Sequence, residues 1–368
     1  MEFISAGPFC AGPPAVCIAL SNVTSPIKTA IVGASGYSGE ELVRLLLGHP
    51  RVQLAAVTSR QYAGQSLAHV FPRYAGDPRC RQLCFSEPKA DLLKKAAQVV
   101  FLALPHGVAA EFAGPLLKMG CKVIDLSADF RLKSPALYRE FYGREHPAPA
   151  LLEQAVYGLP EWYRADIKKA SLIASPGCYP TSILLPVLPL LKAGLVQSSG
   201  LIADSLSGVT GAGRKVELDF LFAECNESAR PYAIPKHRHL SEIEEQLSLA
   251  AGQAVVLQFS PHLIPVNRGI LTTLYLSPAK PLAGDQIAQC YQKAYGQEPF
   301  VRLLEGEALP DTKNVTGTNR IEIAWRLDVR TGRLIVMSAI DNITKGASGQ
   351  AVQSMNILCG FPETAGLI

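Results

Sequence analysis

The chain has 368 residues, of which 48% are hydrophobic and 18% are charged. This length suits about two domains, and the apolar content is enough to bury a core in each, which excludes a small single module and a globally disordered chain. The net charge is only +4, from 35 Lys and Arg against 31 Asp and Glu, and no basic run forms a stripe. We therefore expect no nucleic-acid partner.

The cysteines number nine, which is odd, and no CxxC pair is present to form a zinc or redox motif. A chain of this size with free thiols is typical of the cytoplasm. Residues 170–191 carry no charge and are long enough to suggest a membrane span. However, four prolines interrupt them, so the pattern predicts a buried strand, loop and helix and no membrane association: Pro176, Pro180, Pro186 and Pro189.

Residues 1–26 lack the basic segment of a secretory signal and contain helix-breaking prolines, so we expect a disordered extension. From Ile27 onward, short β-branched runs alternate with amphipathic stretches, which is typical of βαβ units on a parallel sheet. The pattern predicts one helix at 40–47 and strands at 27–32, 52–58, 99–104, 122–126 and 171–174.

Beyond about residue 200 the predicted strands are longer and helices are fewer. The last two strands are separated by 330–332, which favours a hairpin, so this half predicts an α+β domain with a largely antiparallel sheet. Apolar residues at helical spacing then predict a final helix at 347–358 that can fold back on the first domain. The predicted strands are 201–205, 255–259, 269–276, 321–327 and 334–340.

Gly33, Gly36 and Gly39 stand at a spacing of three between the first predicted strand and helix. Backbone amides at such a turn can meet a pyrophosphate with the positive end of the helix dipole, which favours a dinucleotide site over a purely structural turn. The second strand ends in Ser59 and Arg60 where NAD-binding proteins carry an acid. A hydroxyl and a cation suit a 2′-phosphate and predict NADP; the alternative is a solvated Arg60.

The segment SPGCYPT places Cys178 at the end of a predicted strand and the start of a helix. A helix N-terminus stabilises thiolate and lowers thiol pKa, and nearby backbone amides can hold an oxyanion. The position suits a nucleophile. The alternative is a small buried core residue.

His237 and His239 lie in the segment KHRHLSE. An imidazole close to a thiol can deprotonate it and later return the proton. The two rings point the same way if the segment is extended and diverge if it is helical. The alternatives are a solvated basic turn and a zinc site, and zinc fits poorly because no acidic or thiol ligand has suitable spacing. We expect no metal.

The segment DLSADFR places Arg131 just after a predicted parallel strand. Ligands of open α/β sheets bind at the carboxyl ends of the strands, and an arginine there can hold a phosphate or carboxylate through two hydrogen bonds. The alternative is an ion pair between Arg131 and Asp129.

Taken together, these motifs resemble the N-acetyl-gamma-glutamyl-phosphate reductases of arginine biosynthesis. The resemblance runs from about Ile27 to the C-terminus, and the motifs occur in the family's order. They are GASGYSGEEL, ALPHG, DLSADFRL, YGLPE, SPGCYPT, HRH followed by Glu242, NRGILTT and AIDNITKGASGQAVQSMN.

The resemblance implies an α/β fold with a Rossmann-type parallel-sheet domain that binds NADP, at 27–175, completed by the C-terminal helix at 346–368. It places an α+β catalytic and oligomerisation domain at 176–345 and implies a cytoplasmic homodimer or homotetramer. The implied reaction is the NADPH-dependent reduction of N-acetyl-L-glutamyl 5-phosphate to the 5-semialdehyde and phosphate through a cysteine thioester. Alternatives are aspartate-semialdehyde dehydrogenase, LysW-aminoadipate phosphate reductase and a non-catalytic NADP sensor.

The resemblance also implies roles for single residues. Cys178 matches the family's nucleophile, and Arg131 matches an arginine that binds the leaving phosphate in the related aspartate-semialdehyde dehydrogenases. His239 is expected to be the acid/base and His237 to contact substrate, with the assignment between them left open. The implied cofactor-binding residues are Gly33, Ser35, Gly36, Tyr37, Ser38, Gly39, Ser59, Arg60, Pro105 and Asn342.

Overall fold

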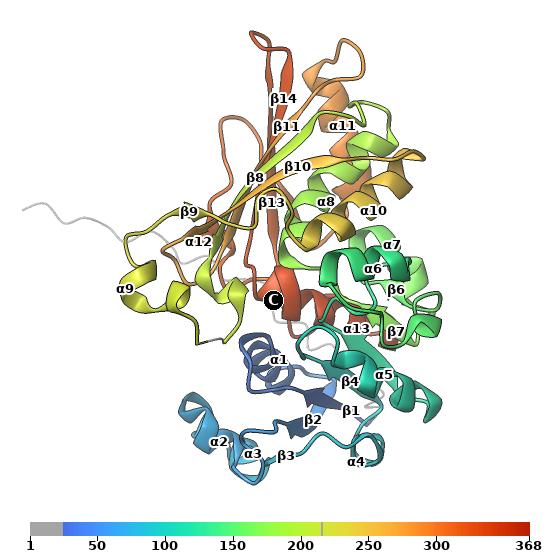
Figure 1. Cartoon of the computed structure of the whole chain (residues 1–368), viewed down its shortest axis with the longest axis vertical. Helices are drawn as coiled ribbons and strands as arrows, with labels where there is room; N and C mark the ends of the chain where they lie inside the picture. Colours follow the sequence, from blue (N-terminus) through green and yellow to red (C-terminus); the bar gives the residue numbers. More distant parts are fainter. Residues whose placement is uncertain (1–24, 215) are drawn as a thin grey trace, which may run out of the picture.

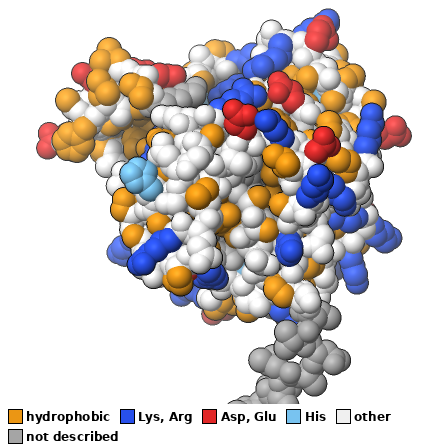
Figure 2. Space-filling model, turned by 90° about the horizontal axis from the view of Figure 1, so that it is seen from below, with side chains coloured by type: hydrophobic (Ala, Val, Ile, Leu, Met, Phe, Trp, Pro, Cys, Tyr) orange, Lys and Arg blue, Asp and Glu red, His pale blue; other side chains and the backbone are white. Residues whose placement is uncertain are grey.

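The computed structural model describes residues 25–214 and 216–368, which form two seven-stranded sheets placed one above the other (Figure 1). The extension expected at 1–26 lies outside the described residues except for its last two. None of the helices in the described part of the chain has the length and apolar character that a bilayer crossing requires. On the face drawn in Figure 2, Lys and Arg side chains are dispersed among uncharged ones.

The first sheet has the strand order β3-β2-β1-β4-β5-β7-β6, and every pairing in it is parallel. The order reverses direction between β1 and β4, as in doubly wound folds whose ligands bind at that point. The predicted Rossmann-type sheet is therefore confirmed. Its strands are β1 Ile27–Val32, β2 Val52–Thr58, β3 Phe85–Ser86, β4 Val99–Leu102, β5 Lys122–Asp125, β6 Val156–Tyr157 and β7 Leu172–Ala174.

Helices cover both faces of this sheet. Successive residues of β1 point to opposite sides, so they pack against different helices. Ile31 packs among residues of α1 and α13, including Met355, whereas Val32 packs among residues of α5, including Phe112. The last helix of the chain therefore completes the core of the first sheet. The helices are α1 Tyr37–Leu47, α2 Leu67–Val70, α3 Pro78–Gln82, α4 Ala90–Ala96, α5 Ala109–Lys118, α6 Pro135–Tyr142, α7 Pro160–Ile167 and α13 Gly349–Cys359.

The second sheet has the order β12-β13-β14-β11-β8-β10-β9. Its pairings are antiparallel except for β8 with β10 and β12 with β13, which confirms the predicted, largely antiparallel α+β half. Its strands are β8 Leu201–Gly208, β9 Arg230–Pro231, β10 Leu257–Ile264, β11 Ile270–Leu276, β12 Val301–Leu303, β13 Ile321–Asp328 and β14 Arg333–Ile340.

Three long helices cover one face of the second sheet: α8 (Cys178–Lys192), α10 (His239–Ala251) and α11 (Gly284–Tyr295) (Figure 1). Alternate residues of the central strands face these helices and are buried. The residues between them, such as Leu271 on β11 and Met337 on β14, point to the opposite face and stay partly exposed. The two short helices of this half are α9 (Phe222–Cys225) and α12 (Thr312–Val315).

The uncharged segment 170–191 forms β7, a turn and α8, as predicted, and α8 continues through its two internal prolines. Proline lacks the N–H that would bond the carbonyl four residues earlier. The carbonyl of Ser182 instead accepts from the hydroxyl of Ser338 at 2.7 Å, and that of Leu185 accepts from the hydroxyl of Tyr295 at 2.6 Å. Side chains of β14 and α11 thus replace both missing donors.

Charged side chains join the C-terminal segment to both halves. Arg268, after β10, bonds Asp341 at 3.0 Å and lies 3.3 Å from Glu41 on α1. The fully buried amine of Lys345 contacts Glu161 of α7 at 2.6 Å. Charges removed from water must be paired, so these contacts set how the C-terminal segment sits between the sheets.

We predict that Tyr295→Phe destabilises the fold more than Tyr291→Phe. Both hydroxyls are buried on α11 and donate to carbonyls of α8. Loss of the Tyr295 hydroxyl leaves the Leu185 carbonyl without a donor, at a cost of about 1–3 kcal/mol. The Pro186 carbonyl, which Tyr291 contacts, can still accept from the helix N–H four residues later. Thermal unfolding followed by circular dichroism measures both variants; equal losses would contradict this account.

Candidate active site

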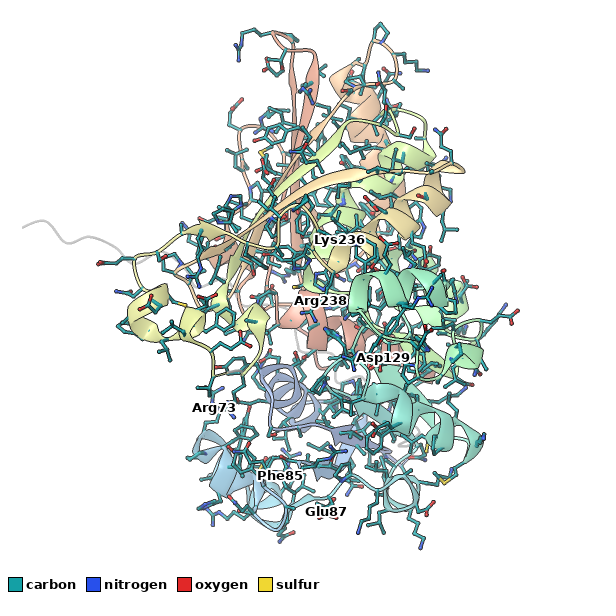
Figure 3. All side chains as sticks on the ribbon, viewed as in Figure 1. Arg73, Phe85, Glu87, Asp129, Lys236 and Arg238 are labelled. Atoms are coloured by element: carbon teal, nitrogen blue, oxygen red, sulfur yellow. The ribbon has the colours of Figure 1, made fainter. Side chains whose placement is uncertain are left out.

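Three of the residues singled out from the sequence, Arg131, Cys178 and His239, meet at the carboxyl ends of β5 and β7. Arg131 comes from the loop after β5, Cys178 is the first residue of α8, and His239 is the first residue of α10. In Figure 3 the labelled Arg238 and Asp129 mark this region, where the start of α10 approaches the loop after β5. Open α/β sheets bind their ligands at this edge.

Cys178 follows Gly177, the N-cap residue of α8, and is partly exposed. Burial raises the pKa of the Cys178 thiol to about 11, although the backbone N–H of Tyr179 and the charge of Arg131 act in the opposite direction. The expectation of a lowered thiol pKa is therefore wrong for the free protein. The helix N-terminus acts as expected, but desolvation outweighs it.

The two histidines lie together, with ring centroids 4.9 Å apart. His237 precedes α10, and its Nδ1 accepts from the backbone N–H of His239 at 3.0 Å. Burial and the charge of Arg238 lower the pKa of His237 to about 4. Burial, with the charges of His237 and Arg131, lowers the pKa of His239 well below its usual value. Burial thus favours the neutral form of both rings. Nδ1 of His237 already accepts a hydrogen bond, so its Nε2 carries the proton and His239 is the better proton acceptor.

His239 is the better placed of the two beside the nucleophile. A Cβ built on Gly177 would lie 2.5 Å from Nε2 of His239, so this nitrogen rests against the residue that precedes Cys178. Its Nδ1 is buried without a hydrogen-bond partner among the described residues. An unpaired buried nitrogen is costly in a purely structural histidine and suits one whose partner is a ligand.

Arg131 is buried and pairs with Glu242 at 3.1 Å, while its other nitrogens donate to the carbonyls of Ser175 and Leu126 at 2.8 Å each. The alternative pairing with Asp129 is wrong. Asp129 instead accepts hydrogen bonds from the backbone N–H groups of Gly107 and Ala110 and from the hydroxyl of Tyr138.

Sequence reasoning assigned no role to Tyr157 or Tyr142 and treated Glu242 only as part of a motif. The Tyr157 hydroxyl donates to Glu242 at 2.6 Å. Burial raises the pKa of the Tyr142 phenol to about 12, and the charges of Arg131 and Glu242 act on it as well. Glu242 could have been found, because residues three apart on a helix share a face, and it stands three after His239.

The glycine turn after β1 forms the expected cradle. Gly33 has φ +84°, and a Cβ there would lie 2.3 Å from the carbonyl of Ala103. A Cβ on Gly39 would lie 2.5 Å from the carbonyl of Gly33, so both positions require glycine. The helix starts at Tyr37, three residues before its expected start, because Gly36 has extended backbone and acts as the N-cap.

At the end of β2, the hydroxyl of Ser59 lies 3.0 Å from that of Ser35, which places both beside the glycine turn. Arg60 is exposed and lies 3.9 Å from Glu111 on α5. Both hydroxyls and this exposed cation fit the 2′-phosphate of NADP, because the strand ends in a hydroxyl and a cation where NAD-binding proteins carry an acid. Pro105 is exposed just after β4, and the Ser38 carbonyl accepts from Ser348 at 2.8 Å.

One further residue approaches this glycine turn from the other half of the chain. Arg214, which sequence reasoning missed, donates to the Ser35 carbonyl at 3.0 Å, and its guanidinium lies 5.6 Å from the ring centre of Tyr37. Asn342 lies deeper, where its amide donates to Thr210 at 3.0 Å and accepts from the N–H of Gly269 at 2.8 Å. Both partners of the Asn342 amide belong to the second half of the chain.

The family model described as "Semialdehyde dehydrogenase, NAD binding domain" matches residues 28–170, and "Semialdehyde dehydrogenase, dimerisation domain" matches residues 178–342. The chain is 55% identical to N-acetyl-gamma-glutamyl-phosphate reductase of Akkermansia muciniphila over 342 residues, which is 93% of this chain and 98% of that one. The enzyme of the same name from Desulfotalea psychrophila is 50% identical, with the same shares covered.

Among solved structures, aspartate semialdehyde dehydrogenase II of Vibrio cholerae matches with a TM-score of 0.69 at 15% identity, over 92% of this chain and 99% of that one. Aspartate semialdehyde dehydrogenase of Candida albicans with NADP also reaches 0.69, at 16% identity, over 90% and 98%. These likenesses show a shared fold. By the identity and coverage of its curated relatives, the chain belongs to the N-acetyl-gamma-glutamyl-phosphate reductase family.

Proposed function

We propose that the chain reduces N-acetyl-L-glutamyl 5-phosphate to N-acetyl-L-glutamate 5-semialdehyde and phosphate, with NADPH as the reductant, in arginine biosynthesis. The observation that carries this is the convergence of Cys178, His239 and Arg131 at one sheet edge, in a chain 55% identical to an enzyme of that name. We place the reaction in the cytoplasm, and the free thiols of the described cysteines support this.

The division of the chain into domains follows from the same proposal. Residues 27–175, closed by 346–368, would hold NADP(H), and residues 176–345 would carry catalysis and oligomerisation. Gly33, Gly36 and Gly39 allow a pyrophosphate to approach the backbone, and Ser35, Ser59 and Arg60 suit the 2′-phosphate. When bound, this cofactor supplies the hydride.

The first step forms the thioester. The sulfur of Cys178 attacks the acyl carbon while His239 takes the thiol proton, and the carbon–oxygen bond to phosphate breaks. Both groups are neutral in the free protein, so the proton moves during attack. The incoming phosphate dianion assists, because a nearby negative charge raises the pKa of an imidazole. Arg131 can still offer the N–H groups that its three protein contacts leave open.

The second step releases the product. With NADPH bound to supply the hydride, the carbon attached to the sulfur of Cys178 would carry an oxyanion, which the backbone N–H groups at the start of α8 can stabilise. Collapse breaks the carbon–sulfur bond, the sulfur leaves with the electron pair, and His239 returns the proton to it. A thioester is needed because it is a better hydride acceptor than an oxygen ester and no longer carries the phosphate charge.

Substitution of the nucleophile tests the chemistry. We expect Cys178→Ala to lower kcat by about 10³-fold or more and His239→Gln by about 10²–10⁴-fold. NADPH binding, followed by the change in its fluorescence, should match wild type in both variants because neither residue lies in the glycine cradle. Loss of NADPH binding together with turnover would instead mark Cys178 as structural.

Substrate choice is tested by the reverse reaction, the phosphate-dependent reduction of NADP. We expect activity with N-acetylglutamate semialdehyde and little with aspartate semialdehyde, and none with either in Cys178→Ala. Activity with aspartate semialdehyde alone would keep the mechanism and change the substrate. No activity with either would favour a LysW-linked substrate or an NADP sensor.

We also propose that the open face of the second sheet is where two copies of the chain meet. The family model that matches 178–342 is described as a dimerisation domain. On this face, six apolar side chains of β8, β11 and β14 stay partly exposed, and the register places Leu271 opposite Leu206 and Tyr275 between Ile202 and Ile335. The six side chains are Ile202, Leu206, Leu271, Tyr275, Ile335 and Met337. Such a face suits a homodimer or a pair of dimers.

A charge on this face should prevent assembly. We expect Met337→Arg to shift the protein to monomers at micromolar concentration, because a guanidinium would be buried unpaired at the centre of the contact. Lys293→Glu, at an exposed position of α11, is the matched control and should keep the wild-type mass. Analytical ultracentrifugation measures both, and an unchanged mass for Met337→Arg would place the interface elsewhere.

A further inference from the structure

Glu242 makes three contacts around the nucleophile although it is almost fully buried. One carboxylate oxygen accepts from the backbone N–H of Gly177 at 2.9 Å and from the Tyr157 hydroxyl at 2.6 Å. The other oxygen lies 3.1 Å from Nη1 of Arg131. A single carboxylate on α10 thus contacts the residue before Cys178, a tyrosine of β6 and the loop after β5.

The partner of Glu242 is itself fixed by the backbone. Arg131 donates through Nε to the carbonyl of Ser175 and through Nη2 to the carbonyl of Leu126, both at 2.8 Å. These carbonyls belong to the loops that follow β7 and β5. The guanidinium therefore holds two parallel strand ends together, and a lysine in its place could not reproduce its planar geometry.

Gly177 is the point on which these groups converge. A Cβ built on it would lie 2.5 Å from Nε2 of His239 and 2.9 Å from Nη1 of Arg131. The backbone of Gly177 is thus in close contact with the imidazole and the guanidinium, while its N–H is held by Glu242. A shift of Gly177 would move Cys178 relative to His239.

The ion pair of Arg131 and Glu242 also affects the Cys178 thiol through the charges of its two members. After burial, which dominates, the charge of Arg131 lowers the pKa of Cys178 and that of Glu242 raises it. The phenols of Tyr179 and Tyr232 also interact with the thiol, and the imidazole of His239 lies against the residue before it. Because Glu242 offsets Arg131, removal of the carboxylate charge should make the thiol more acidic.

We propose that Glu242 is a positioning residue for the nucleophile, which anchors the Gly177 N–H and offsets the charge of Arg131 beside it. The role rests on the proposed function, since it concerns the same thiol. Glu242 acts in opposite directions on two properties that a nucleophile needs, the position of its sulfur and the ionisation of its thiol. Glu242 favours the place of the sulfur at the expense of thiolate in the free protein.

Two substitutions separate these properties. Glu242→Gln removes the charge and keeps the length, but one of its amide hydrogens must then face a donor, either Arg131 or Gly177. Glu242→Asp keeps the charge but is one methylene too short to hold both contacts. Glu245→Gln is the matched control, because Glu245 lies on the same helix and, among residues 25–214 and 216–368, accepts a hydrogen bond from the backbone N–H of Lys133 alone.

The experiment measures iodoacetamide labelling of Cys178 in the full chain, by mass spectrometry of its peptide, from pH 6 to pH 10. The exposed Cys84 serves as the internal reference. For Glu242→Gln we expect labelling at pH 8 to be about threefold faster or more, because below the pKa the rate follows the thiolate fraction. Glu242→Asp and Glu245→Gln should keep the wild-type pH profile.

Turnover gives the second readout. We expect kcat to fall by about tenfold or more in both Glu242→Gln and Glu242→Asp, with little change in KM, because a displaced nucleophile loses rate more than binding. Glu245→Gln should keep the wild-type kcat. The role is overturned if both Glu242 variants keep wild-type kcat, or if Cys178 in Glu242→Gln labels as fast as Cys84, which would mean local unfolding.

The labelling measurement does not require substrate, so the inference and the proposed function can fail separately. A wild-type protein inactive on both aldehydes would contradict the proposed reaction, while faster labelling of Cys178 in Glu242→Gln alone would still support the positioning role. Unchanged labelling and unchanged kcat in an active protein would contradict the positioning role and leave the reaction standing.

Discussion

The site depends on one close packing contact between the C-terminal segment and the nucleophile. A Cβ on Gly346 would lie 2.7 Å from the Cβ of Cys178, so no other residue fits there without moving the cysteine. The same segment places Lys345 on Glu161 and Asp341 on Arg268. These buried pairs hold it between the sheets, so the nucleophile is positioned from both halves of the chain.

Buried charge shapes the chemistry as much as packing does. Burial raises the pKa of Asp125 to about 7, with the charge of Asp129 adding to the effect, and raises that of the Cys178 thiol to about 11. Burial also lowers the pKa of His239. Burial shifts each of these groups toward its neutral form, because a charge is less stable away from water. The free protein thus holds Cys178 as the neutral thiol, so its proton must pass to His239 as the sulfur attacks.

Local signals in the sequence predicted the parts of the site that lie within one strand, turn and helix. The glycine turn, Cys178 at a helix start and the hydroxyl and cation after β2 were recognised in this way, as were both sheets. Contacts between distant segments were not predicted. The pairing of Arg131 with Glu242 rather than Asp129 depends on how α10 packs against the strand ends, and periodicity carries no information about such contacts.

The sequence by itself determined the family, the two sheet types, the dinucleotide turn and the candidate nucleophile, because each depends on residue types at fixed local spacing. Only the tertiary structure decided the ionisation of Cys178 and His239, the partner of Arg131 and the donors that let α8 continue through its prolines. The physical reason is that desolvation, ion pairing and hydrogen-bond satisfaction depend on neighbours in space, which only the folded chain brings together.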